Sequence, residues 1–171
     1  MTAQKATCQG RGSVSMKFVS HEDIEAPVGF VFKAVTDFTG HERAALRRGA
    51  DVQRLNATVE PGPGASWNVA FHYHGKIRRM IARITRCDHL ELVEFAGVSD
   101  GFELTLQINL LALSPRRTRL TMSLDLRPRS LGARLMLQSA KLGRSRLKHR
   151  YDEKLRAYAQ RIETRAALSV I

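Results

Sequence analysis

The spacing of apolar residues changes along the chain, and each change predicts a different element. Residues 16–25 place Phe18 and Ile24 on the same parity, which predicts a strand. The next apolar residues follow the i, i+3, i+4, i+7 spacing of a short helix, namely Val28, Val31, Phe32 and Val35. Residues 41–49 predict a second short helix that stops at Gly49, because glycine suits a helix C-terminus. The chain therefore begins as strand, helix, helix.

From residue 51 onward, apolar residues recur at every second position. Clusters of Gly, Pro, Asp and Ser interrupt them at the intervals expected of hairpins. The pattern predicts an antiparallel meander of six strands with one buried face and one wet face. Its clearest hairpin joins residues 102–110 to residues 120–126, and Pro128 ends the sheet.

Residues 130–165 contain no proline and predict one long helix with a bend at Gly143. Its apolar side chains fall within about a third of the helix circumference. They are Met136, Leu137, Ala140, Leu147, Tyr151, Leu155, Tyr158 and Ile162. Because this stripe needs an apolar surface to pack on, we expect the helix to lie across the buried face of the sheet.

This order of elements resembles the START-like superfamily, also called the polyketide cyclase/dehydrase and lipid transport group, or SRPBCC. The local resemblance is strongest at residues 24–38, 61–76 and 99–128, which read IEAPVGFVFKAVTDF, PGPGASWNVAFHYHGK and SDGFELTLQINLLALSPRRTRLTMSLDLRP. The resemblance implies an α+β helix-grip fold. In that fold a curved seven-stranded antiparallel sheet, with two short helices after strand 1, wraps around a long C-terminal helix and leaves a cavity. It transfers no reaction, because no catalytic motif of the family is present.

We expect one domain over residues 16–165, since 171 residues suffice for one sizeable core. Residues 1–15 are small and polar and predict a disordered tail, and Met16 is a plausible alternative start. Residues 166–171 predict a C-terminal tail. No apolar run approaches the roughly 20 residues that cross a bilayer, and the first fifteen residues lack a secretory signal. With only two cysteines, Cys8 and Cys87, a soluble protein of the reducing cytoplasm is expected.

The inward parities predict the lining of an apolar pocket between sheet and helix. The expected lining residues from the sheet are Trp67, Phe71, Tyr73, Met80, Phe95, Phe102, Leu104, Met122 and Leu124. Those from the helix are Met136, Leu137, Ala140 and Tyr151. Pockets are mostly apolar with a few placed polar groups. We expect an apolar ligand, lipid, quinone or polyketide-like. The alternative is that these side chains simply fill the core.

Glu22 shares the inward parity of Phe18 and Ile24. A buried carboxylate needs a partner or a raised pKa, so Glu22 is a candidate polar anchor for the ligand, or a general acid or base. The alternative is that the open end of the sheet leaves it wet. A cyclase or aromatase that uses Glu22 or Tyr73 is therefore a second hypothesis. The absence of a catalytic motif favours the first, non-catalytic binding of a ligand.

The His72-x-His74 and Cys87-x-His89 pairs have residue types and a spacing that suit zinc. The two pairs lie about 40 Å apart along a strand at ~3.3 Å per residue, and the first two histidines have the polar parity. We therefore expect no metal and no other cofactor.

The net charge of +12 adds a possible partner surface to this picture. Residues 130–165 hold ten basic and three acidic residues, or +7 of that total, and Leu131, Leu135 and Leu142 lie opposite the main apolar stripe. Leucines flanked by cations suit docking on an anionic membrane. The alternatives are packing on the short helices or on a dimer partner, so monomer and homodimer both stay open. An RNA or ribosome partner is kept as an alternative, although nucleic acid is not expected because no aromatic residues interleave the charges.

Overall fold

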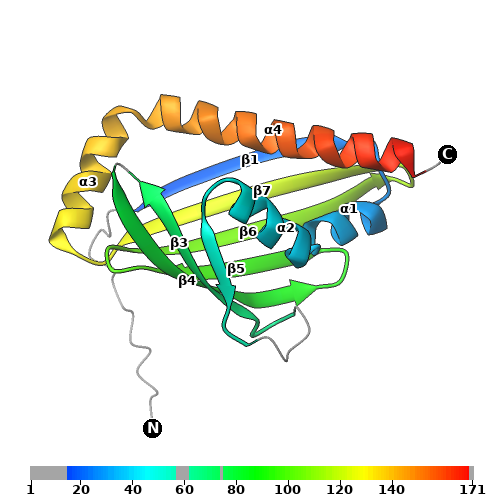
Figure 1. The fold of residues 1–171 in the computed structure, drawn as a ribbon. Coiled ribbons are helices and arrows are strands. Elements are labelled where there is room, and N and C mark those ends of the chain that lie inside the picture. Colours follow the sequence, from blue (N-terminus) through cyan, green and yellow to red (C-terminus); the bar gives the residue numbers. More distant parts are fainter. Residues whose placement is uncertain (1–14, 57–61, 74, 170–171) are drawn as a thin grey trace, which may run out of the picture.

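A seven-stranded antiparallel sheet crossed by a long helix organises the chain (Figure 1). The computed structural model describes residues 15–56, 62–73 and 75–169. The strands are β1 (Met16–Ile24), β2 (Asp51–Arg54), β3 (Ser66–Tyr73), β4 (Lys76–Asp88), β5 (Leu92–Val98), β6 (Phe102–Ser114) and β7 (Arg117–Pro128). The helices are α1 (Val28–Val35), α2 (Phe38–Arg47), α3 (Leu131–Leu142) and α4 (Arg144–Leu168). The predicted fold class, an α+β helix-grip, is confirmed.

The sheet order is β1-β7-β6-β5-β4-β3-β2, so the first strand pairs with the last and the rest form a meander. Register fixes which side chains share the face toward the helices. Phe18 lies opposite Leu124, Leu124 opposite Leu106, and Leu106 opposite Phe95. Because strand side chains alternate between faces, the inward parities expected from the sequence are the ones that the structure shows.

Local capping explains where the short helices begin. Pro27 precedes α1, and its carbonyl accepts hydrogen bonds from the amides of Phe30 and Val31. The second helix begins at Phe38, three residues before the expected start, because the Asp37 carboxylate accepts the Gly40 amide at 3.0 Å and caps it there.

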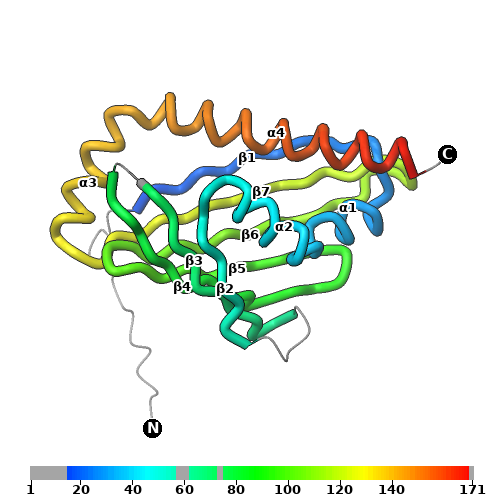
Figure 2. The backbone as a smooth tube through the Cα atoms, in the orientation of Figure 1, coloured from blue at the N-terminus to red at the C-terminus, as the bar shows by residue number. Residues whose placement is uncertain are grey.

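The expected long helix is divided in two at Gly143. Ser130 caps α3 by accepting the Ala133 amide at 3.1 Å, and α4 starts anew after the glycine. The bend expected at Gly143 is therefore a break. The second segment extends to Leu168, beyond the expected end at residue 165, because Ala166 is buried against the core. Figure 2 shows α3 turning away from the line of α4, whereas α1 and α2 lie near the opposite end of α4.

Two apolar clusters fill the space between sheet and helices. The first core cluster lies beneath α1 and the C-terminal half of α4, and it includes Ile24, Val31, Ile84, Leu120, Leu155 and Ile162. Met16, Phe18 and Leu137 form the second core cluster, against which Phe102, Leu124 and Tyr151 pack. The concave face is thus closed at the α1 end and more loosely covered at the α3 end. Among the described residues, no helix is both long and apolar enough to cross a membrane.

Candidate functional site

The concave face of the sheet carries a continuous band of apolar side chains that are only half-buried although they face the helices. We call it the inner band. Its residues are Val69, Phe71, Met80, Phe95, Leu104, Leu106, Met122 and Leu124. Strand register makes the band contiguous, since Met80 lies opposite Val69 and Leu106 lies opposite both Phe95 and Leu124. Apolar surface of this kind on a concave face is what a small-molecule site presents.

The centre of the inner band is the part that packs least against the buried core clusters. Within the described part of the chain, Phe71, Met80 and Leu104 belong to neither core cluster. Gly97 lies between two of them: a Cβ added there would stand 2.7 Å from Leu104 Cγ and 2.9 Å from Met80 Sδ. A glycine at this position therefore lets the two side chains converge over the strand.

Tyr151 on α4 adds a polar group to the apolar wall of this face. Its ring lies 5.8 Å from the ring of Phe18 and packs against the second core cluster. Its hydroxyl is buried and has no hydrogen-bond partner among the described residues. Burial, with a smaller contribution from the Asp152 charge, raises the pKa of Tyr151 to about 12, so the hydroxyl keeps its proton and is a donor at neutral pH.

Trp67, also expected to line the pocket, is buried at the closed end instead. Its ring packs on Phe38, and its Nε1 donates to Glu42 Oε1 at 2.6 Å. Arg54 pairs with the same oxygen at 2.6 Å. Burial alone would raise the pKa of Glu42, but the hydrogen bonds from Trp67 and Arg54 hold it below its ordinary value. These contacts hold α2 against β2 and β3, so the role of Trp67 is structural.

Glu22 faces inward, as its parity predicts, but it lies beside α4 rather than over the inner band. Its Oε1 is 3.6 Å from Nε of Arg156, and its side chain is 25% exposed. Nearby, the Glu25 amide donates to Glu163 at 3.0 Å. These polar contacts join strand β1 to α4 along the edge of the sheet, which gives the inward carboxylate a charged partner in the protein itself.

The remaining predicted lining residues differ in their surroundings. Leu137 is buried, and Phe102 and Ala140 pack beside it in the second core cluster. Met136 points away from the sheet and is 42% exposed, because α3 buries the face that carries Ala133 and Leu137. The side chain of Tyr73 lies outside the described residues.

The histidine and cysteine pairs are not brought together. His72 is exposed, while Cys87 is half-buried against the first core cluster beyond an irregularity in β4 between Ile84 and Arg86. Burial, and secondarily the Asp88 charge, raises the pKa of the Cys87 thiol. His74 lies outside the described residues, and across residues 15–56, 62–73 and 75–169 no three His, Cys, Asp or Glu side chains gather as metal ligands would.

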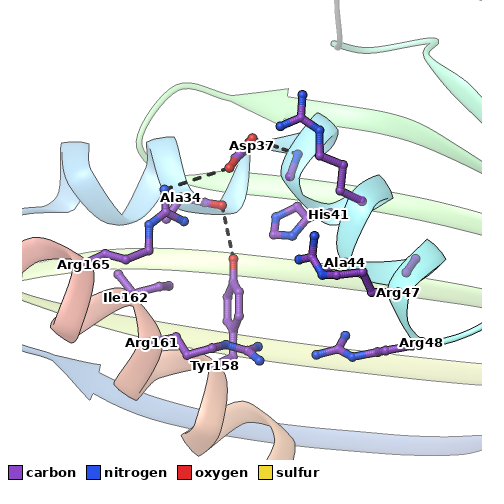
Figure 3. Close-up of a pocket in the computed structure, with 13 residues that line it drawn as sticks. Ala34, Asp37, His41, Ala44, Arg47, Arg48, Tyr158, Arg161, Ile162 and Arg165 are labelled. Carbon is purple, nitrogen blue, oxygen red and sulfur yellow. Dashed lines mark hydrogen bonds and ion pairs between the residues drawn. The ribbon is translucent and has the colours of Figure 1, made fainter.

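Sequence reasoning missed a cleft of about 580 Å³ between α1–α2 and the C-terminal half of α4 (Figure 3). Its lining residues include five arginines, Arg43, Arg47, Arg48, Arg161 and Arg165. Of the apolar helix stripe expected in the pocket region, only Tyr158 and Ile162 reach this cleft. The signal in the sequence was the arginine content of α2, which becomes meaningful only when the fold places that helix opposite α4.

Comparison with known proteins places the fold but not the activity. No protein-family model matches the sequence, and no curated protein matches it. Among solved structures, the Zhui aromatase/cyclase from Streptomyces sp. R1128 superposes with a TM-score of 0.62 at 16% identity, covering 88% of this chain and 95% of that one. Norcoclaurine synthase from Thalictrum flavum gives 0.63 at 10% identity, covering 88% and 96%.

A third structure, Ara h 8.0201, gives a TM-score of 0.57 at 12% identity and covers 88% of this chain and 99% of that one. These likenesses confirm the START-like helix-grip fold that the order of elements suggested. At identities of 10–16% these likenesses show the fold and not the function.

Proposed function

We propose that this protein binds an apolar small molecule, of lipid, quinone or polyketide-like character, on the concave face of its sheet. The observation that carries the proposal is the inner band, because its apolar side chains face the helices and yet are only half-buried. Each 100 Å² of apolar surface that a ligand covers contributes about 2.5 kcal/mol, so a modest ligand would bind without many polar contacts.

The Tyr151 hydroxyl supports a ligand with one hydrogen-bond acceptor. A buried hydroxyl without a partner is unfavourable by about 1–3 kcal/mol, and a carbonyl or hydroxyl oxygen of the ligand would relieve that penalty. The expected ligand is therefore mostly apolar with a carbonyl or hydroxyl group near one end. Such a carrier, working in the cytoplasm, needs no cofactor.

The test uses Nile red, a neutral dye whose fluorescence rises in apolar sites, with a matched pair of variants on one strand. Leu104→Gln places an amide in the centre of the inner band. Leu111→Gln makes the same change on β6 at a leucine that is 59% exposed. We expect Leu104→Gln to weaken dye binding at least about tenfold and Leu111→Gln to leave it unchanged.

Equal dye affinity in both variants would overturn the proposal, because binding would then not depend on the concave face. Urea unfolding of each variant shows whether Leu104→Gln still folds. If it does not, Gly97→Ala supplies a milder change at the same place, since the new methyl would displace Leu104 and Met80. Native mass spectrometry of the purified protein would then identify a retained ligand.

A cyclase or aromatase remains the alternative function. Such chemistry needs polar groups that converge on the bound substrate, and Glu22 is the acid that sequence reasoning put forward. Its contact with Arg156 favours a structural role for this carboxylate. The measurement that separates the two functions is turnover of a linear polyketide mimic by the unmodified protein and by Glu22→Gln: an activity that Glu22→Gln abolishes would support the enzyme.

The outer face of α3 supports a second proposal, that the protein docks on anionic membranes. Leu131, Leu135 and Leu142 are 76%, 66% and 92% exposed, so they pack neither on the short helices nor on the sheet. They lie within one stripe of the helix, since their positions differ by four and seven residues. Arg134 and Lys141 flank the stripe and, within the described chain, form no ion pair. Leucines beside free cations suit an anionic lipid surface better than a neutral one.

Cosedimentation with phosphatidylserine-containing vesicles tests this docking surface. We expect binding to phosphatidylserine vesicles, weaker binding to pure phosphatidylcholine, and loss of binding in Leu135→Gln/Leu142→Gln. Leu168→Gln is the control, because this leucine is 66% exposed but lies at the end of α4. Dimerisation that the double variant abolishes would contradict the proposal in favour of a second copy, and salt-sensitive RNA binding lost in the same variant would contradict it in favour of nucleic acid.

A further inference from the structure

The cleft between α2 and α4 gathers positive charge from two distant parts of the chain. Arg43, Arg47 and Arg48 come from α2 and its C-terminal end, and Arg161 and Arg165 come from α4. Figure 3 shows Arg47 and Arg48 extending from α2 toward Tyr158 and Arg161 on α4. We call this pocket the arginine cleft.

The negative charge at the cleft is far smaller than the positive charge. Asp37 is the one carboxylate among its lining residues in the described structure. One oxygen of Asp37 caps α2 by accepting the Gly40 amide at 3.0 Å, and the other lies 4.0 Å from Nη2 of Arg165, the longest ion-pair distance in the described protein. Most of the guanidinium charge is therefore not balanced from within the cleft.

Glu42, the acid next to Arg43 in the sequence, is not among the lining residues and already has partners. Arg54 on β2 and Trp67 on β3 both donate to its Oε1. Across residues 15–56, 62–73 and 75–169, no ion pair involves Arg43, Arg47, Arg48 or Arg161. By contrast, Arg119 pairs with Asp23 at 2.7 Å on the opposite edge of the sheet. Like charges held across a cleft repel, and an anion between them would convert that repulsion into attraction.

The shape and lining of the cleft indicate the kind of anion. Its volume of about 580 Å³ is that of a small-molecule site, too large for a single ion and too small for a polymer. The rings of His41 and Tyr158 lie 6.0 Å apart, and Ala34 and Ile162 add an apolar surface. The Tyr158 hydroxyl donates to the Ala34 carbonyl at 3.3 Å, so the ring rather than the hydroxyl faces a ligand.

From this arrangement we propose that the arginine cleft binds a small phosphate-bearing anion with two or more negative charges. Planar guanidinium groups form paired hydrogen bonds with phosphate oxygens, and cations from two walls suit a group with oxygens on several sides. Arg161 already lies over the Tyr158 ring at 5.6 Å, which holds one guanidinium in place before the anion arrives. This site is separate from the apolar one on the concave face.

Isothermal titration calorimetry with pyrophosphate tests the site in the full chain. We expect one-to-one binding that weakens with added salt, together with a rise in the thermal unfolding midpoint. Arg47→Gln/Arg161→Gln removes one cation from each wall and should weaken binding at least about tenfold. The control, Arg83→Gln/Arg150→Gln, lowers the net charge by the same two units at arginines outside the cleft.

Equal weakening by the two double variants would overturn the proposal, because binding would then follow net charge alone. Binding of Nile red should be the same in Arg47→Gln/Arg161→Gln as in the unmodified protein, so a failure here leaves the apolar-ligand proposal standing. A second titration with dihexanoyl phosphatidic acid distinguishes the source of the phosphate. Tighter binding of that soluble lipid than of pyrophosphate would assign the cleft to a lipid headgroup, and the reverse to a free phosphate compound.

Discussion

The two ends of the concave face are built from the same kinds of residue but are covered differently. At the closed end, Ile24, Ile84 and Leu120 are fully buried beneath α1 and α4. Toward α3, residues of the same inward parity, such as Leu124 on β7 and Leu104 on β6, are only half-buried. The break at Gly143 turns α3 away from the line of α4, so the helix covers one half of the sheet more closely than the other. Stability is therefore expected to reside in the first half and binding in the second.

The largest effect should come from the closed end. Leu120→Ala removes a side chain with 0% exposure and should destabilise the fold by about 2–5 kcal/mol, because the cavity cannot collapse between sheet and helix. Leu104→Ala removes the same atoms from the inner band and should cost only about 1 kcal/mol, since water already reaches that position. Urea unfolding of both variants measures the difference, and equal losses would mean that the two ends do not differ as described.

The next largest effect concerns the contact that closes this end over β2 and β3. Trp67→Phe keeps an aromatic ring but removes the Nε1 donor to Glu42, and it should cost about 1–3 kcal/mol. Phe95→Leu, at a half-buried ring that also contacts Phe38, is the comparison. A loss for Trp67→Phe no larger than for Phe95→Leu would show that ring volume, not the hydrogen bond, holds α2 in place.

Much of this fold could be predicted from periodicity alone, because strand parity and helix spacing are local properties of the sequence. The inward set on β6 and β7 was predicted correctly for this reason. What could not be predicted was how closely the helix covers each position. Met136 and Leu137 are neighbours in the expected stripe, yet one is 42% exposed and the other 4%, because α3 buries only the face that carries Ala133 and Leu137.

The candidate sites show the same limit. Parity placed Glu22 on the inner face correctly, but only the packing of α4 on β1 brings Arg156 to it. The arginine cleft joins residues about 120 positions apart, and a pairing of that range depends on tertiary structure that no local pattern contains. The sequence therefore predicted which residues face inward, and the structure was needed to show which of them meet.

A smaller effect, on the order of 1 kcal/mol by pH 11, should appear as alkaline pH ionises tyrosines at both ends. Burial raises the pKa of Tyr158 to about 12, and burial does the same for Tyr151. Unfolded tyrosine ionises near pH 10, so the stabilising contribution is complete below pH 10 and is lost as the pH rises toward 12.

Urea unfolding at several pH values, for the unmodified protein and for Tyr158→Phe, isolates the contribution of this one tyrosine. The stability of the variant should fall less steeply between pH 10 and pH 11, because it lacks the group that resists ionisation. Parallel pH profiles would contradict the buried position of the Tyr158 hydroxyl.

The smallest loss of stability, and the sharpest test of the open end, should come from Tyr151→Phe. Removing a buried hydroxyl that has no partner in the described structure should not lower stability, since no hydrogen bond is lost, and should raise it by up to the roughly 1–3 kcal/mol that the unpartnered group costs. A ligand whose oxygen accepts from that hydroxyl should nevertheless bind several-fold more weakly to the variant.

Nile red carries a carbonyl, so its affinity can be compared with that of an alkane-like probe without an acceptor. If both probes lose affinity equally, the hydroxyl acts only through the shape of the wall. If only the carbonyl-bearing probe does, the polar anchor of the concave face is Tyr151, and the loosely covered end is a binding surface that also selects its ligand by a single hydrogen bond.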